Sequence, residues 1–217
     1  MDKKKKVYII SGLGAGSNVF NRVDFGSSSE PVFIEWLQPK KKESLENYSL
    51  RMAESIKTDE PFYLVGYSFG GMIVQEINKH FPAIKVILLG SLKSSSEKSL
   101  FFKFLKLTRI YKIVPISFFT HKNFLSYAFF RKMYSRRLPD LFEYFTVRDP
   151  YYLKWSIHQV IQWKGKKQDN TLQILATKDL VFPIKHCRPE FVIQNATHLF
   201  PVTHYSKLSA LLQKILI

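Results

Sequence analysis

Short apolar runs alternate with stretches of helical periodicity along most of this chain. Six of the runs predict β-strands, at residues 7–10, 31–37, 61–67, 85–89, 171–176 and 190–194. They are short, apolar and rich in β-branched and aromatic residues, which is typical of buried strands. Apolar residues recur at helical spacing in three further segments, residues 44–57, 71–80 and 206–217. Strands that alternate with helices predict an α/β protein with a mostly parallel sheet and helices on both faces.

One segment interrupts this alternation. Residues 94–167 are rich in Phe, Tyr, Lys and Arg, and Pro115, Pro139 and Pro150 divide them into several predicted helices. Predicted strands flank the segment on both sides. We therefore interpret 94–167 as a helical cap inserted into a single domain that spans residues 1–217.

The positive charge of the chain is concentrated in the same region. The formal net charge is +16, and residues 93–170 hold 16 Lys/Arg against 5 Asp/Glu, a net of +11. Such a surface attracts anions, whether nucleic acid, an anionic membrane or an acidic substrate. Solvated lysines in a generally basic protein would explain the same excess.

Composition narrows the class of protein. Hydrophobic residues make up 46% of the chain, which favours a folded domain over a disordered one. Cys187 is the sole cysteine, so the sequence excludes an internal disulfide framework and fits a reducing compartment. No apolar run is long enough for a signal peptide or a membrane span, and we expect a cytoplasmic protein.

A serine stands between two glycines where the third apolar run ends abruptly. The stretch "LVGYSFGGM" contains Gly66-Tyr67-Ser68-Phe69-Gly70, with a predicted strand before it and a predicted helix after it. A tight strand-to-helix turn of this kind exposes the serine hydroxyl, and the glycines remove side chains that would collide across it. The alternative is a glycine-rich turn that contains an ordinary serine.

With this motif the chain resembles an α/β-hydrolase, a fold in which the nucleophilic serine is followed in sequence by an acid and then a histidine. The resemblance implies that Asp179 is the acid, since it lies just past the fifth predicted strand and "DLVFP" is similar to the family pattern there. Glu97 and Asp149 are rival acids, but neither directly follows a strand.

The resemblance implies that His198 is the base, because "ATHL" follows the last predicted strand and precedes the terminal helix. His204 is a rival and should lie at the start of that helix. The remaining histidines lie outside the expected position and are expected to be structural or exposed: His80, His121, His158 and His186.

Two backbone N–H groups should form the oxyanion hole, at Phe69 and at Leu13 in the loop after the first strand. That loop reads Ser11-Gly12-Leu13-Gly14, so Ser11 stands where the family usually has a histidine that braces the loop. A dinucleotide site is a weaker interpretation of this loop, because "GLGAGS" lacks the Gly-x-Gly-x-x-Gly spacing.

These features predict a serine hydrolase that cleaves a carboxylic ester or thioester through an acyl-serine intermediate, with no metal or organic cofactor. The aromatic cap suggests an apolar acyl substrate, and its basic charge suggests peripheral contact with an anionic membrane surface. Helices that pack their aromatic residues against the core and leave their lysines outside would explain the same pattern. A non-catalytic homologue that binds a small ligand is the alternative. Nucleic-acid binding is not expected, because no known DNA- or RNA-binding motif is present.

Overall fold

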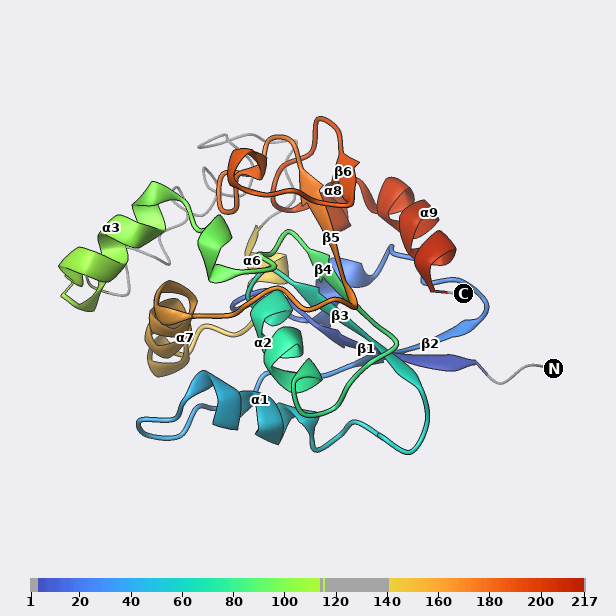
Figure 1. Cartoon of the computed structure of the whole chain (residues 1–217), viewed down its shortest axis with the longest axis horizontal. Helices are drawn as coiled ribbons and strands as arrows, with labels where there is room; N and C mark the ends of the chain where they lie inside the picture. Colours follow the sequence, from blue (N-terminus) through green and yellow to red (C-terminus); the bar gives the residue numbers. More distant parts are fainter. Residues whose placement is uncertain (1–3, 114, 116–140, 217) are drawn as a thin grey trace.

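A six-stranded sheet forms the centre of the molecule, and every neighbouring pair of strands in it is parallel (Figure 1). The computed structural model describes residues 4–113, 115 and 141–216. The strand order is β2-β1-β3-β4-β5-β6. The strands are β1 (Lys5–Ile10), β2 (Ser29–Phe33), β3 (Phe62–Tyr67), β4 (Lys85–Leu89), β5 (Thr171–Ala176) and β6 (Phe191–Ile193).

Helices follow most of the strands. The α-helices are α1 (Leu45–Ala53), α2 (Phe69–Asn78), α3 (Leu100–Thr108), α6 (Leu141–Tyr144), α7 (Pro150–Gln162), α8 (Phe200–Thr203) and α9 (Tyr205–Ile215). Within the part of the chain that the structure describes, short 3₁₀ helices join them: η1 (Ser17–Phe20), η2 (Ser95–Glu97), η3 (Ile110–Lys112) and η4 (Ile184–His186). Within the described ranges, no helix has both the length and the apolar character that crossing a membrane requires.

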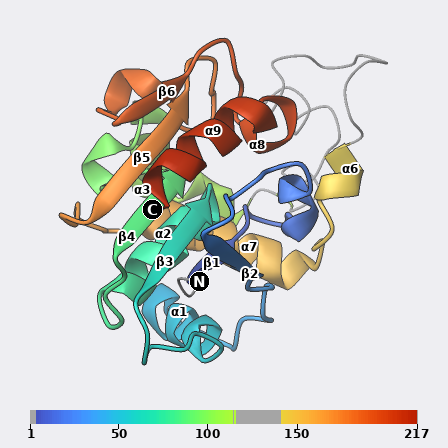
Figure 2. The ribbon, with the colours of Figure 1, turned by 90° about the vertical axis from the view of Figure 1, so that its right-hand side faces the viewer.

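Alternate side chains of the strands enter two separate apolar cores. In β1, Val7 and Ile9 pack with η1, α8 and α9, whereas Tyr8 and Ile10 pack with α1 and α2. This division follows from the two-residue period of a strand. Figure 2 shows α1 and α9 on opposite sides of the sheet. The prediction of a parallel sheet with helices on both faces is confirmed.

The second strand is displaced from its predicted position. The sequence predicted it at 31–37, but β2 ends at Phe33 because its partner β1 ends at Ile10; the last backbone bond between the two segments joins Ile34 N to Ile9 O at 2.9 Å. Trp36 belongs to no strand. Its ring stacks on Phe69, with ring centroids 5.5 Å apart, so this apolar residue packs beside the serine turn.

The predicted insertion contributes α3 and α7, which pack against each other through a small apolar cluster formed by Leu105, Tyr111 and Ile161. Helix α7 begins at Pro150, where the sequence predicted a break, and Asp149 caps it by accepting a hydrogen bond from Tyr152 N at 2.7 Å. The predicted break at Pro139 lies outside the described residues. The limits of the cap and its status as an insertion stay predictions.

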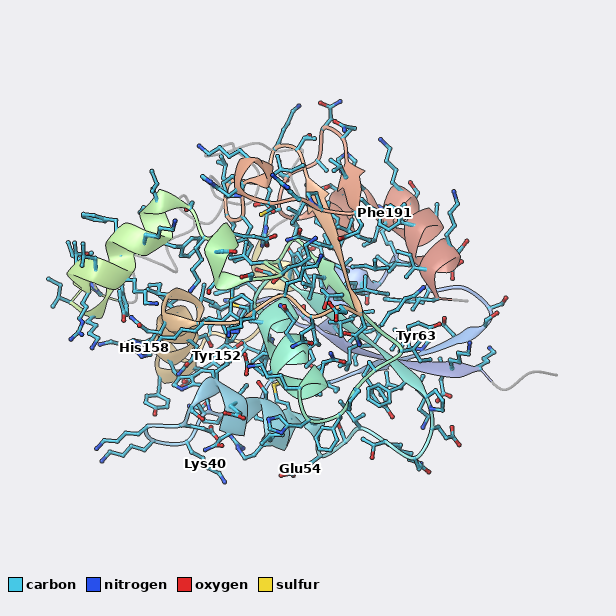
Figure 3. All side chains as sticks on the ribbon, in the orientation of Figure 1. Lys40, Glu54, Tyr63, Tyr152, His158 and Phe191 are labelled. Atoms are coloured by element: carbon cyan, nitrogen blue, oxygen red, sulfur yellow. The ribbon has the colours of Figure 1, made fainter. Side chains whose placement is uncertain are left out.

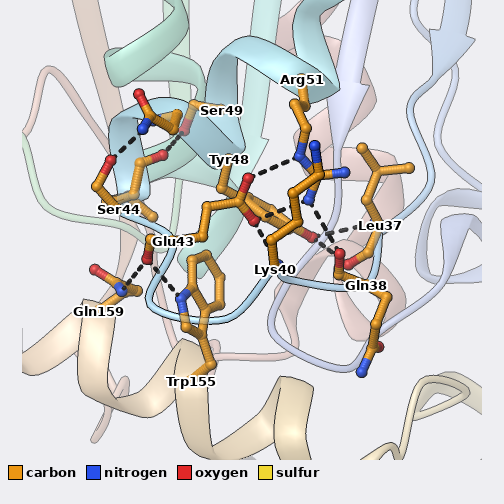
Figure 4. A network of polar contacts seen from close by, with 12 residues as sticks. Leu37, Gln38, Lys40, Glu43, Ser44, Tyr48, Ser49, Arg51, Trp155 and Gln159 are labelled. Carbon is orange, nitrogen blue, oxygen red and sulfur yellow. Dashed lines mark hydrogen bonds and ion pairs between the residues drawn. The ribbon is translucent and has the colours of Figure 1, made fainter.

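A polar network connects α7 to the loop that precedes α1 (Figure 4). The Glu43 carboxylate accepts hydrogen bonds from Arg51 Nε at 2.7 Å and from Arg51 Nη2 at 2.9 Å. The guanidinium lowers the pKa of Glu43. The backbone carbonyl of Glu43 accepts from Trp155 Nε1 at 3.0 Å and from Gln159 Nε2 at 3.4 Å. Both donors lie on α7, so the network holds this helix against the main body of the fold.

A buried lysine holds the C-terminal end of α7. The amine of Lys98 donates to the carbonyl oxygens of Ile161 and Trp163, both at 2.8 Å. These are among the last carbonyls of the helix, which have no partner within it. Burial lowers the pKa of Lys98 to about 7. Glu43 therefore holds the middle of α7, and Lys98 independently holds its C-terminal end.

Candidate active site

Ser68 occupies the abrupt turn between β3 and α2. Its backbone has φ 53° and ψ −117°, a strained conformation for a residue with a side chain. Its N–H donates to Leu89 O at 2.8 Å, which joins the turn to the end of β4. The serine side chain therefore stands at the carboxyl end of the central strands, where parallel sheets place their ligands.

The two glycines that flank Ser68 are required by close backbone contacts. A Cβ atom on Gly66 would lie 2.5 Å from Gly70 O, on the other side of the turn. A Cβ atom on Gly70 would lie 2.3 Å from the carbonyl oxygens of both Ile10 and Ser11. These neighbours are backbone atoms and cannot move aside, so the glycines let the turn approach the end of β1.

The Gly70→Ala variant is therefore expected to be destabilised by about 3 kcal/mol, at the upper end of the usual cost of overpacking. The added methyl would force apart β1 and the start of α2. Urea unfolding followed by circular dichroism measures this loss of unfolding free energy. An unchanged denaturation midpoint would contradict the close approach described above.

One chain of hydrogen bonds connects Ser68, His198 and Asp179. His198 Nε2 lies 2.9 Å from Ser68 Oγ, and His198 Nδ1 lies 2.7 Å from Asp179 Oδ2. Ser68 is 8% exposed, Asp179 3% and His198 0%, so water is largely excluded from these contacts. In such surroundings hydrogen bonds between polar groups are strengthened.

Asp179 and His198 are themselves held by backbone and aromatic groups. Oδ1 of Asp179 accepts from the N–H groups of Val181 and Phe182, at 2.8 and 3.0 Å, which leaves Oδ2 for the histidine. Tyr67 donates its hydroxyl to His198 O at 3.0 Å. Burial, together with the charge of Asp179, raises the pKa of Tyr67 well above its usual value, so the hydroxyl stays protonated as a donor.

The rival acids and the rival base lie elsewhere. His204 directly precedes α9, as expected, and its Nδ1 contacts Thr203 Oγ1 at 2.9 Å. Asp149 caps α7, and Glu97 accepts from Lys93 N and Gln173 Nε2, at 2.8 and 3.0 Å. None of these three is in the hydrogen-bond chain of Ser68.

Four other histidines were set aside on sequence grounds. His80 contacts Glu46 and His158 contacts Tyr111, each at 2.9 Å, so both have structural partners. His186 is partly exposed and lines the cavity beside Ser68. His121 lies outside the described residues.

The loop after β1 approaches Ser68 from the other side. Gly12, Leu13, Ser68 and Phe69 line one cavity, so the two predicted oxyanion donors belong to adjoining walls. Phe69 is the first residue of α2, and its N–H has no carbonyl partner within the helix.

The described residues contain no cluster of His, Cys, Asp and Glu that could hold a metal ion.

Comparison with known proteins gives structural matches without close sequence relatives. No family model matches the chain, and no curated protein matches its sequence. An alpha/beta hydrolase fold protein from Burkholderia ambifaria superimposes with a TM-score of 0.71 at 11% identity, over 99% of this chain and 92% of the other. The chain has the α/β-hydrolase fold.

Two further structures share this α/β-hydrolase fold. A lipase-esterase related protein from Clostridium acetobutylicum gives a TM-score of 0.68 at 15% identity and covers 100% of this chain and 96% of its own. A thermophilic esterase from Thermogutta terrifontis gives a TM-score of 0.62 at 12% identity, and the match covers 100% of this chain and 90% of the esterase. Sequence identities this low show a shared fold only. The chemistry of this protein must therefore be inferred from the geometry of its own site.

Sequence reasoning missed two residues that shape the loop after β1 in this α/β-hydrolase fold. Trp36 Nε1 donates to Ala15 O at 2.9 Å, and the hydroxyl of Tyr152 accepts from Gly14 N at 3.4 Å. Ser11 braces the same loop from within, since its Oγ donates to Gly16 O at 2.8 Å. The buried serine thus supports the loop at the position where histidine is usual. Tyr152 is recognised as a residue of this site by its burial and its contact with Gly14, both of which are visible only in the structure. No sequence motif identifies it.

A cavity of about 540 Å³ opens beside Ser68. Its apolar wall comes from α3, α7 and the loop after Asp179, and includes Leu100, Phe102, Leu105, Leu153, Ile157 and Phe182. Lys185 and His186 are the basic side chains among its described lining residues, and none of those residues carries a carboxylate. This volume suits a small molecule, since ligand pockets measure roughly 300–1,000 Å³.

Proposed function

We propose that this protein is a serine hydrolase that cleaves a carboxylic ester or thioester through an acyl-serine intermediate. The observation that carries the proposal is the continuous hydrogen-bond chain from Ser68 Oγ through His198 to Asp179, with distances of 2.9 and 2.7 Å. A serine hydroxyl is a weak nucleophile, and a positioned base with an orienting acid is the arrangement that activates it.

In the proposed reaction, Ser68 Oγ attacks the substrate carbonyl carbon while its proton passes to His198 Nε2. The tetrahedral intermediate collapses, and the leaving alcohol or thiol takes the proton from His198. Water then attacks the acyl-serine, again giving its proton to His198, and releases the acid while Ser68 regains a proton. Asp179 keeps His198 Nδ1 protonated and stabilises the charged imidazolium, so Nε2 faces the serine as the acceptor.

The N–H groups of Leu13 and Phe69 are the proposed donors to the oxyanion. Both residues line the cavity at Ser68, and the N-terminus of α2 adds a positive partial charge there. Ser11, Trp36 and Tyr152 then act as positioning residues, because they hold the loop that carries Leu13.

The cavity supports an apolar acyl group as the substrate portion that lies beside Ser68. Its wall is formed mainly by aliphatic and aromatic side chains of α3 and α7, which offer an acyl chain apolar contact and few hydrogen bonds. Esters of medium-length acids are therefore expected to be turned over faster than acetyl esters, because burial of each additional methylene contributes about 0.8 kcal/mol.

Labelling with a fluorophosphonate tests the proposed nucleophile. The wild-type protein is expected to gain one phosphonyl group at Ser68, detected by mass spectrometry of the intact protein and its peptides. Ser68→Ala should lose both labelling and hydrolysis of acyl esters. Ser49→Ala serves as the matched control, because Ser49 is a buried serine of α1 whose Oγ donates to Leu45 O at 2.8 Å and which does not line the cavity.

Labelling that persists in Ser68→Ala would refute the assignment. A protein that binds acyl compounds but neither labels nor turns them over would instead support the non-catalytic alternative.

A further inference from the structure

Helix α3 exposes an unusual amount of apolar surface. Leu107 is 84% exposed, Leu100 75%, Phe101 63% and Phe104 55%, and Ile113, which follows η3, is 81% exposed. Contiguous apolar surface of this kind marks an interaction site on a soluble domain. Figure 1 places α3 at the extremity of the molecule opposite α9, and Figure 3 shows its side chains standing out from that end.

The exposed residues form one stripe of the helix. Leu100, Phe104 and Leu107 are separated by four and three residues, so they lie on the same face. Phe102 and Leu105 occupy the other side and pack with Ile161 of α7. The fold therefore uses one face of α3 for its own packing and leaves a second apolar face outward.

Basic side chains accompany this stripe, and acidic ones are absent from the sequence around it. Residues 99–113 contain Lys103, Lys106, Arg109 and Lys112 but no Asp or Glu, and the acid-free run continues in the sequence to Pro139. A protein partner would need an apolar group opposite each exposed apolar side chain and an acidic group opposite each lysine. A broad anionic surface with an apolar interior fits an exposed stripe beside several lysines more directly.

We propose that α3 docks on an anionic lipid surface. Leu100, Phe104 and Leu107 enter the boundary of the acyl chains, while Lys103 and Lys106 remain at the level of the head groups. The long aliphatic stems of lysine allow this, since the ammonium group stays in water while the stem contacts apolar material.

The same helix connects this surface to the cavity. Leu100 and Phe101 are exposed and also line the cavity beside Ser68. When α3 is docked, this part of the cavity wall therefore contacts the lipid surface. This step rests on the proposed function: an acyl substrate would pass between lipid and the site without crossing water. Docking itself needs no catalysis and is tested separately.

Co-sedimentation of the Ser68→Ala protein with vesicles tests the docking, because this variant cannot alter the lipid. We expect it to bind vesicles of phosphatidylcholine with about one third phosphatidylglycerol, to bind pure phosphatidylcholine weakly, and to detach as salt rises. The same measurement on Lys103→Gln/Lys106→Gln should show partitioning about tenfold weaker at low salt, since one lysine near an anionic surface contributes about fivefold at most.

Two further double variants complete the design. Phe104→Ser/Leu107→Ser should lose binding yet hydrolyse a short soluble ester at the wild-type rate, because neither residue lines the cavity. Lys207→Gln/Lys214→Gln removes the same charge from exposed positions of α9 and should keep binding.

Absence of vesicle binding, or equal losses in the two lysine variants, would overturn the proposal. A concentration-dependent dimer that Phe104→Ser/Leu107→Ser dissociates, without vesicle binding, would assign the stripe to a second copy of the chain and overturn it as well. Turnover of the short ester by wild-type protein decides the proposed function independently of either result.

Discussion

Replacement of His198 with alanine is expected to lower kcat by at least about a thousandfold, because Ser68 would lose the only group in its hydrogen-bond chain that can take its proton. The alanine would also leave Asp179 with an unused acceptor in a buried site. KM should change little, since the imidazole lies beneath the cavity wall and is fully buried. Steady-state hydrolysis of a short chromogenic ester measures both constants.

His204→Ala is the matched control for this measurement. His204 lies six residues further along the chain and contacts Thr203 at the start of α9, so its loss should leave kcat within about twofold of the wild-type value. A large loss in His204→Ala combined with a small one in His198→Ala would show that the hydrogen bonds between Ser68, His198 and Asp179 do not carry the chemistry.

The Asp179→Asn substitution is expected to lower kcat about ten thousandfold, although the asparagine side chain has the same shape as the aspartate it replaces. The N–H groups of Val181 and Phe182 would hold the amide oxygen of the asparagine, so its NH₂ group would face His198 Nδ1. Nδ1 would then have to accept a hydrogen bond, and the imidazole proton would move to Nε2. In that tautomer Nε2 can no longer take the proton of Ser68.

Asp149→Asn controls for the loss of an acidic group. Asparagine is as good a helix cap as aspartate, so α7 should form normally and activity should stay close to wild type. The same ester assay measures both variants, and circular dichroism confirms that they fold. Asp179→Asn with near-normal turnover would mean that the carboxylate has no orienting role.

The sheet could be predicted from the sequence because each strand is short, apolar and separated from the next by a helix or a polar loop. The exception is β2, where apolar residues extend to Leu37 although the strand ends at Phe33. Periodicity does not distinguish a residue that pairs in a sheet from one that packs on it. Trp36 is apolar because it stacks on Phe69.

Ser68, Asp179 and His198 could be selected before their distances were known because the chain resembles an α/β-hydrolase, in which the serine, the acid and the histidine follow the ends of successive strands in this order. Their catalytic roles stay predictions until the variants above are measured. Tyr152 could not be selected, because its hydroxyl reaches Gly14 only through the packing of α7, which pairs residues 138 positions apart. Contacts of that kind have no local signature in the chain.

The sequence separation within the hydrogen-bond chain has a consequence for the order of events in folding. Ser68 and His198 are 130 positions apart, and His198 follows β6, which pairs with β5 at the far side of the sheet from β1. Parallel pairing between distant segments closes large loops and is slow. The hydrogen bond between Ser68 and His198 therefore forms only after β4, β5 and β6 have joined β3. We expect a chain that has not yet completed this pairing to carry the whole Gly-x-Ser-x-Gly motif and still be inert toward esters.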